Sequence, residues 1–329
     1  MADTWTLIAD IGGTNARFAA CQGDRVIDTK AYDTEPGQSL LSLALRYCSS
    51  RHSPPDIAVL AVAGPVAGNA VHLTNTGHRL NGDDLRDAIG ARQVHIINDF
   101  AAAAWAVSDV DPSDLGVICG SARPGSGTRL VIGPGTGLGV GAISPIHGGL
   151  HAIVGEGGHA GIGPRTREDA DVFEALRNLW PEAFFGQTLT LEAEAILSGT
   201  GLPMMYRAVQ SVRGKPHTDM TPQAIFTTAR AGSDPEAVRV VSIFKTYLAQ
   251  LAGDLGLSFG ATGGVFLVGG IAQKNPWLFD AEFVDRLRSG GRFTRHRSAL
   301  DVYLLQRPDF GLMGAQSYAA LMAAQGRGD

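Results

Sequence analysis

Cysteine is scarce in this sequence, with three residues in a chain of 329. Cys21, Cys48 and Cys119 are odd in number, lie far apart and form no CxxC pair. A disulfide framework needs paired cysteines, and a cysteine zinc site needs closely spaced ligands. The scarcity therefore excludes both a disulfide-stabilised secreted domain and a cysteine-based zinc site.

Long apolar runs and targeting signals are also missing. No uninterrupted apolar segment is long enough to cross a bilayer. The first residues carry neither the basic region nor the apolar core of a signal peptide. Hydrophobic residues make up 44% of the chain, as in an ordinary soluble protein. The sequence predicts a cytoplasmic protein without a membrane partner.

Strong positive charge is absent as well. The formal net charge is −5. The densest basic patch places Arg292, Arg295 and Arg297 around Phe293, and we interpret it as a solvated surface. Proteins that bind nucleic acids or anionic lipids carry larger basic clusters. We therefore predict no nucleic-acid partner and a small-molecule substrate.

Glycine, in contrast, is abundant, and the 43 glycines gather at strand ends rather than in a repeat. No GxxxxGK[ST] P-loop occurs. Two other glycine-rich turns are present, the first formed by Ala9, Asp10, Ile11, Gly12, Gly13 and Thr14 and the second centred on Gly135, Thr136 and Gly137. Glycine N–H groups can approach phosphate oxygens because no Cβ intervenes. The second turn alone could be a tight hairpin, but together the two turns predict a nucleotide site.

The segment after each turn indicates a strand rather than a helix. Residues 16–22 and 25–32 continue the first turn as an antiparallel meander, and a similar pattern follows Arg129. P-loops and dinucleotide-binding turns both need a helix directly after the glycines. The repeated meander instead predicts two related lobes, as the chain length also does.

Alternating strands and helices favour an α/β fold. Buried strands are expected at 57–63 and 94–97, and helices at 39–47 and 100–107. Farther along, Thr166, Thr221 and Asp234 have the pattern of helix N-caps. The helix after Asp234 is predicted to bury one face, formed by Val238, Val241, Phe244, Tyr247, Leu248, Leu251 and Leu255.

Asp10 and Asp99 each follow a predicted strand and are the candidate carboxylates for phosphoryl transfer. Asp10 would stand near a nucleotide-bound Mg²⁺, through water; alternatively it caps its own turn. Asp99 precedes a helix, whose partial positive charge favours an ionised carboxylate. Such a carboxylate can accept the proton of an alcohol nucleophile. The alternative is that Asn98 or Asp99 is a helix N-cap.

Two further glycine-rich segments carry candidate binding residues. Glu156 and His159 stand among glycines, where both can point into a cleft and bind hydroxyl groups. Metal binding is the alternative, but no second ligand cluster follows. Gly269 and Gly270 end a strand and would leave room for an adenine or ribose, or would serve close packing at a helix entry.

Motifs along nearly the whole chain resemble those of the bacterial glucokinases, ATP-dependent hexose kinases of the actin, hexokinase and heat-shock ATPase superfamily. The motifs occur in family order: ADIGGTNARF at 9–18, AGPVAG at 63–68, LTN at 73–75, INDF at 97–100, GPGTGLGV at 133–140, GEGGH at 155–159, ILSG at 196–199, GGVFLVGGI at 263–271 and GLMGA at 311–315. The cysteine-rich zinc motif of the broader sugar-kinase and repressor relatives is absent.

This resemblance implies a two-lobed ribonuclease-H-like α/β fold, with ATP and the sugar in a cleft between the lobes. We expect a small domain at 1–109 plus 305–329 and a large domain at 110–304. The chain would phosphorylate the 6-hydroxyl of glucose with ATP and Mg²⁺, and a homodimer is also implied.

The same resemblance implies roles for individual residues. Asp99 would be the base, and Asn98, Glu156 and His159 would hold the other hydroxyls of the sugar. Glu194, directly before ILSG, is the candidate for a further sugar ligand, with Glu192 as its competitor. Another hexose as substrate, a protein-partnered ATPase and a non-catalytic sugar sensor are the alternatives.

Overall fold

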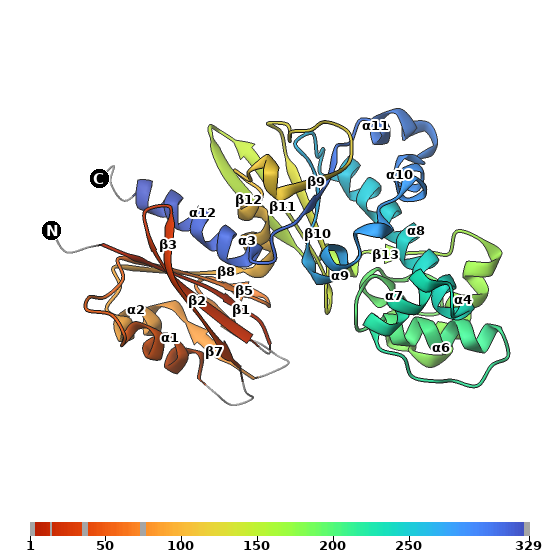
Figure 1. Cartoon of the computed structure of the whole chain (residues 1–329), viewed down its shortest axis with the longest axis horizontal. Helices are drawn as coiled ribbons and strands as arrows, with labels where there is room; N and C mark the ends of the chain where they lie inside the picture. The colour runs from red at the N-terminus through yellow and green to blue at the C-terminus, as the bar shows by residue number, and fades with distance from the viewer. Residues whose placement is uncertain (1–3, 14, 35–38, 73–76, 326–329) are drawn as a thin grey trace. The chain divides into compact units, whose positions relative to one another are not determined.

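The computed structural model describes residues 4–13, 15–34, 39–72 and 77–325, grouped in two compact units (Figure 1). The first unit comprises Met1–Val110, Gly141–Val154 and Asp309–Asp329, and the second comprises Asp111–Val140 and Gly155–Pro308. The predicted assignment of functional domains stays a prediction. Thr14 and the LTN motif at 73–75 lie outside the described residues.

The first unit is an α/β layer structure. Its main elements, in chain order, are β1 (Thr6–Ile11), β2 (Asn15–Gln22), β3 (Arg25–Asp33), α1 (Leu40–Cys48), β4 (Ile57–Val62), β5 (Val66–Ala67), β6 (Ala70–His72), β7 (Arg79–Asn81), α2 (Gly82–Ile89), β8 (Gln93–Asn98), α3 (Asp99–Ala106) and α12 (Phe310–Gln325). Five strands form one sheet in the order β3-β2-β1-β4-β8, with β1, β4 and β8 parallel.

Both faces of this sheet are buried, because alternate side chains of each strand point to opposite sides. Leu7, Ala9 and Ile11 of β1 belong to the core under α1 and α2, whereas Ile8 belongs to the core under α12. Asp10 follows the same alternation and lies on the α12 face of the sheet, where its carboxylate packs against Gly311.

Helix α12, from the end of the chain, packs against α3 (blue beside orange in Figure 1). The two helices approach closely at Gly314, where an added Cβ would lie 1.7 Å from the Ala102 carbonyl oxygen. The GLMGA motif therefore has a packing reason: Gly311 makes room for Asp10, and Gly314 makes room for α3.

The second unit combines a sheet with a group of helices. Its elements, together with strands β11 and β12 that continue into the first unit, are η1 (Pro112–Asp114), β9 (Leu115–Cys119), β10 (Arg129–Pro134), β11 (Leu138–Ile146), β12 (Gly149–Gly155), η2 (Gly157–His159), β13 (Gly161–Ile162), α4 (Arg167–Leu179), η3 (Pro181–Ala183), β14 (Leu191–Glu192), α5 (Glu194–Leu197), α6 (Leu202–Val212), α7 (Pro222–Ala231), α8 (Pro235–Ser258), β15 (Gly264–Leu267), α9 (Gly269–Lys274), η4 (Pro276–Leu278), α10 (Ala281–Arg288), η5 (Gly291–Phe293), α11 (Thr294–Ser298) and β16 (Val302–Leu305).

Its sheet has the order β12-β11-β10-β15-β16-β9. Strands β10, β11 and β12 are consecutive neighbours, as are β1, β2 and β3 in the other sheet. The predicted repeat of the opening meander is therefore confirmed. A strand follows each glycine turn, which also confirms that neither turn is a P-loop or a dinucleotide-binding turn.

The predicted helix N-caps are confirmed. The side chains of Thr166, Thr221 and Asp234 accept hydrogen bonds from the first turns of α4, α7 and α8. The prediction that Val238 faces inward is wrong, because its side chain is 42% exposed. The buried face of α8 begins at Ala237 and continues through Val240 and Val241, so Val238 lies just beyond its edge.

The interpretation of the arginine patch as a solvated surface is also wrong for Arg297, which is 2% exposed. Its guanidinium donates to the Ser289 carbonyl at 2.6 Å and pairs with Asp254. Added Cβ atoms at Gly253 or Gly290 would collide with it. Arg297 is a structural residue, and the reason is tertiary packing that its sequence neighbours do not show.

Candidate active site

The first glycine turn is a hairpin between β1 and β2. The Gly12 N–H donates to the Asn15 carbonyl at 2.8 Å, and Ile11 pairs with Ala16. Ala9 and Ile11 are fully buried in the core of the first unit. Gly13 is exposed at the tip of the hairpin.

Asp10 is the titratable group of this hairpin. Burial raises the pKa of its carboxyl, and the positive charge of Arg17, its cross-strand neighbour, opposes that shift. Within the described residues, no hydrogen bond or ion pair to the Asp10 carboxylate is found. A partly desolvated carboxylate with this environment fits a nearby cation, which would favour its charged form.

The second glycine turn is held by a segment that sequence reasoning did not connect with it. The Gly135 N–H donates to the Gly137 carbonyl, and the Gly199 N–H donates to the Gly135 carbonyl, both at 2.8 Å. The Thr200 hydroxyl donates to the Thr136 carbonyl at 2.9 Å. The end of the ILSG motif therefore fixes the shape of the turn.

Glu194 contacts the same turn. Its Oε2 accepts a hydrogen bond from the Leu138 N–H at 2.7 Å. A Cβ on Gly137 would lie 2.6 Å from that oxygen, so a side chain at position 137 would displace the carboxylate. The structure thus brings Glu194 to the predicted phosphate turn.

Glu192, the competing acid, lies beside His159. Strands β13 and β14 pair Gly161 with Glu192, and the His159 Nδ1 is 2.8 Å from the Glu192 Oε2. This hydrogen bond raises the pKa of His159; burial opposes the shift, while the charges of Glu194, Glu192 and Glu156 add to it. Glu156, Glu192 and Glu194 therefore form an acidic cluster around the His159 imidazole.

The glycines of the GEGGH motif permit this cluster. A Cβ on Gly158 would lie 1.9 Å from the Leu138 carbonyl oxygen, and one on Gly157 would lie 2.9 Å from Val140. The short helix η2 therefore packs directly on the start of β11. Glu156 and His159 remain exposed at its two sides.

Asn98 and Asp99 occupy the junction of β8 and α3. Asn98 is the N-cap: its Oδ1 accepts from the Phe100 N–H at 2.8 Å, and its Nδ2 donates to the Gly64 carbonyl at 3.0 Å. Asp99 is the first helical residue, and its Oδ1 accepts from the Phe100 N–H at 3.0 Å. The alternative left open from the sequence is settled: the cap is Asn98.

A pocket of about 750 Å³ adjoins the second glycine turn. It is lined at one end by Gly135, Thr136 and Gly270 and elsewhere by Phe226, Arg230 and Trp277, among others. The Arg230 guanidinium lies 6.0 Å from the centre of the Trp277 ring. Sequence reasoning missed these three residues, because they come from α7 and η4 and meet through tertiary packing.

Gly269 and Gly270 serve different purposes at the entry to α9. Gly269 has a φ of +86°, and a Cβ there would lie 2.9 Å from the Pro134 carbonyl oxygen. Gly270 lines the pocket, and no atom within 4 Å would meet its Cβ. Close packing therefore explains Gly269, whereas room for a ligand stays a prediction for Gly270.

The candidate residues are divided between the units. Asp10, Asn98 and Asp99 lie on the first unit. Those on the second are Glu156, His159, Glu194, Gly135, Gly137, Gly269 and Gly270. In the described part of the chain, no group of His, Cys, Asp and Glu side chains has the arrangement of a metal site. The helices found there include none that is long and apolar enough to span a membrane.

Comparisons with known proteins match nearly the whole chain to glucokinases. The family described as Glucokinase matches residues 7–322. A glucokinase of Nitrobacter hamburgensis is 35% identical over 311 residues, which cover 94% of this chain and 95% of the relative. The crystal structure of a glucokinase from an Antarctic psychrotroph has a TM-score of 0.83 at 30% identity, covering 98% and 100% of the two chains.

More distant structures share the fold. A Balamuthia mandrillaris glucokinase in complex with glucose has a TM-score of 0.78 at 23% identity, covering 97% of this chain and 94% of its own. A ROK family glucokinase from Streptomyces griseus, in complex with glucose and AMPPNP, has a TM-score of 0.60 at 20% identity, with coverages of 95% and 98%. These likenesses confirm the predicted ribonuclease-H-like α/β fold. The chain belongs to the glucokinase family.

Proposed function

We propose that this protein transfers the γ-phosphoryl group of ATP to the 6-hydroxyl of glucose, giving glucose 6-phosphate for glycolysis. Family membership supports the reaction class. The observation that carries the residue assignment is the position of Asp99, which begins α3 directly after strand β8. A carboxylate there is favoured in its charged form by the helix N-terminus.

Asp99 is the proposed general base. Its ionised carboxylate orients the 6-hydroxyl and accepts the hydroxyl proton as the oxygen bonds to the γ-phosphorus. The bond from that phosphorus to the bridging oxygen breaks, and ADP leaves. Because phosphoryl transfer passes through a loose transition state, the proton can move late, and a carboxylate of ordinary basicity suffices.

Glu156 and His159 are the proposed ligands of the remaining sugar hydroxyls, with Asn98 as a third. A carboxylate such as Glu156 can accept hydrogen bonds from two neighbouring hydroxyls. The bond from Glu192 fixes the orientation of the His159 ring. Asn98 has already committed Oδ1 to its capping role, so its contribution to the sugar is the second hydrogen of Nδ2.

The nucleotide is proposed to lie along the glycine turns. Backbone N–H groups of Gly13 and Gly137 would bind phosphate oxygens. Gly12, whose own N–H donates to the Asn15 carbonyl, would shape the turn beside the phosphates. The adjoining pocket, with its aromatic and guanidinium surfaces, is suited to a purine base and ribose. Mg²⁺, bound to ATP, would neutralise phosphate charge, and Asp10 would hold it through water.

Substrate identity is tested with a panel of sugars at saturating ATP and Mg²⁺. We expect glucose to give the highest kcat/KM among glucose, fructose, mannose and glucosamine, and 6-deoxyglucose to give no product. Sites built to bind a hydroxyl reject analogues that lack it by roughly 10⁴–10⁵ in kcat/KM. A higher kcat/KM for another hexose would reassign the substrate and leave the kinase chemistry intact.

We also propose that the protein acts in the cytoplasm as a homodimer, without nucleic-acid or membrane partners. The net charge of −5 supports the absence of polyanionic partners. Sedimentation of the purified protein tests the dimer, which a monomeric mass would contradict.

A further inference from the structure

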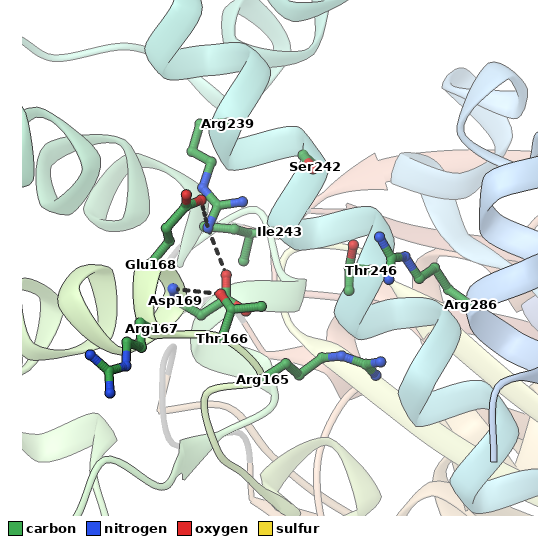
Figure 2. Close-up of a pocket in the computed structure, with 10 residues that line it drawn as sticks. All are labelled: Arg165, Thr166, Arg167, Glu168, Asp169, Arg239, Ser242, Ile243, Thr246 and Arg286. Atoms are coloured by element: carbon green, nitrogen blue, oxygen red, sulfur yellow. Dashed lines mark hydrogen bonds and ion pairs between the residues drawn. The ribbon is translucent and has the colours of Figure 1, made fainter. Parts of the chain in front are cut away.

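A second pocket lies on the second unit, beside helix α8 (Figure 2). Its volume is about 410 Å³, and it shares no lining residue with the pocket at the glycine turn. The lining comes from the start of α4, one face of α8 and the end of α10: Arg165, Thr166, Arg167, Glu168, Asp169, Arg239, Ser242, Ile243, Thr246 and Arg286.

Four arginines and two carboxylates line this pocket, so its lining is net positive. The buried Asp169 is already satisfied, by the Arg239 guanidinium at 2.7 Å and the Tyr247 hydroxyl at 3.2 Å. Arg239 also lies 3.8 Å from Glu168. Arg239 thus pairs closely with Asp169 and only loosely with the exposed Glu168, which leaves three other arginines to account for.

Among the described residues, the remaining arginines have no carboxylate partner within hydrogen-bond distance. Arg165 donates to the neutral Gln250 side chain at 2.7 Å. Arg286 is 3.8 Å from Glu282 on its own helix, and Glu282 pairs with Lys245 as well. Arg167 has no hydrogen bond or ion pair among the residues that the structure describes. The like charges of Arg165 and Arg286, which line the same pocket, repel one another, and an added anion would relieve that repulsion.

Hydroxyl donors face the same space. Ser242 and Thr246 lie one helical turn apart on α8 and both line the pocket, with the Arg286 guanidinium near Thr246 in Figure 2. Several guanidinium donors and two hydroxyls exceed what the two oxygens of one carboxylate accept. They match the three terminal oxygens of a phosphoryl group, whose geometry suits the guanidinium fork.

We propose that this pocket binds the phosphoryl group of a small phosphorylated metabolite, a phosphomonoester. Arg165 and Arg286 supply the charge, and Ser242 and Thr246 supply neutral donors. The site is independent of the proposed catalytic residues. Arg239 is excluded from the binding set, because it neutralises the buried Asp169.

The test is calorimetric titration of glycerol 3-phosphate into the full-length protein saturated with glucose and AMPPNP, so that the proposed catalytic site is filled. Arg165→Gln and Arg286→Gln remove one charge each from exposed positions. Arg25→Gln, an exposed arginine of β3 on the other unit, is the matched control. Glucose phosphorylation by each variant reports whether the catalytic site remains intact.

We expect one binding event in the unchanged protein and the Arg25→Gln control. Each pocket variant should bind about tenfold more weakly, or worse, as the loss of a charge-assisted hydrogen bond implies. Absence of binding to the unchanged protein, or equal binding by all variants, would overturn the proposal. Inorganic phosphate is titrated in parallel. If it binds as tightly as the ester, the site belongs to the free ion and the metabolite assignment is wrong.

Discussion

Two neighbouring acids illustrate how residues of one type acquire different surroundings. Glu194 accepts a hydrogen bond from the backbone of the second glycine turn, whereas Glu192 is bonded to His159. Their sequence separation from these partners is 56 and 33 residues. Spacing and motif order could nominate both acids, but the contacts depend on how β14 and α5 pack, which no local pattern encodes.

Replacement of Glu194 by Gln should act on the nucleotide. The amide keeps an acceptor for the Leu138 N–H but loses the charge that strengthens the bond, so the turn becomes less ordered. We expect the KM for ATP to rise several-fold, and by at least as large a factor as the KM for glucose. Glu192→Gln is the matched control and should leave the KM for ATP nearly unchanged. A similar KM for ATP in both variants would show that Glu194 does not order the turn.

The titration of His159 tests the Glu192 contact. Since the pKa of His159 is raised above its ordinary 6.5, the charged pair stabilises the fold fully below that value. This contribution is lost as pH rises through the higher folded pKa. In NMR titrations, Glu192→Gln should lower the pKa of His159 toward 6.5. An unchanged pKa would mean that the hydrogen bond is not maintained in solution.

At the scale of elements, most helix starts and the strands after the glycine turns could be predicted from the sequence. Thr166, Thr221 and Asp234 were identifiable because capping is local chemistry. The errors at Val238 and Arg297 have a different origin, since burial depends on which neighbours cover a helix face. The pocket residues Phe226, Arg230 and Trp277 could not be predicted for the same reason, because no local sequence pattern marks them as binding residues.

The crossing of α12 and α3 yields a prediction at this scale. Gly314→Ala would place a Cβ 1.7 Å from the Ala102 carbonyl oxygen, so the helices must separate. We expect a loss of about 1–3 kcal/mol in the free energy of unfolding despite the better helix propensity of alanine. Denaturant titration measures this free energy of unfolding.

Gly163→Ala is the matched control, because its Cβ would meet no atom within 4 Å. It should leave the free energy of unfolding nearly unchanged. Equal free energies of unfolding for the two variants would contradict the close approach of the helices.

At the scale of the whole molecule, the family motifs are distributed over two units of related strand order. Asp10 and Asp99 belong to the first, and the acidic cluster and the pocket at the second glycine turn belong to the second. The α/β class and the repeated meander could be predicted, because glycine turns between strands leave a clear pattern. In contrast, the role of each site residue is proposed from its motif and its surroundings, and needs a measurement.

The most direct measurement concerns Asp99 as the base. Asp99→Asn keeps the size of the side chain and leaves the Asn98 cap in place, but it cannot accept the proton. We expect kcat for glucose phosphorylation to fall by roughly 10²–10⁴, the usual contribution of a general base. Calorimetric binding of glucose and AMPPNP should change little. A variant that keeps more than about a tenth of the original kcat would contradict the account.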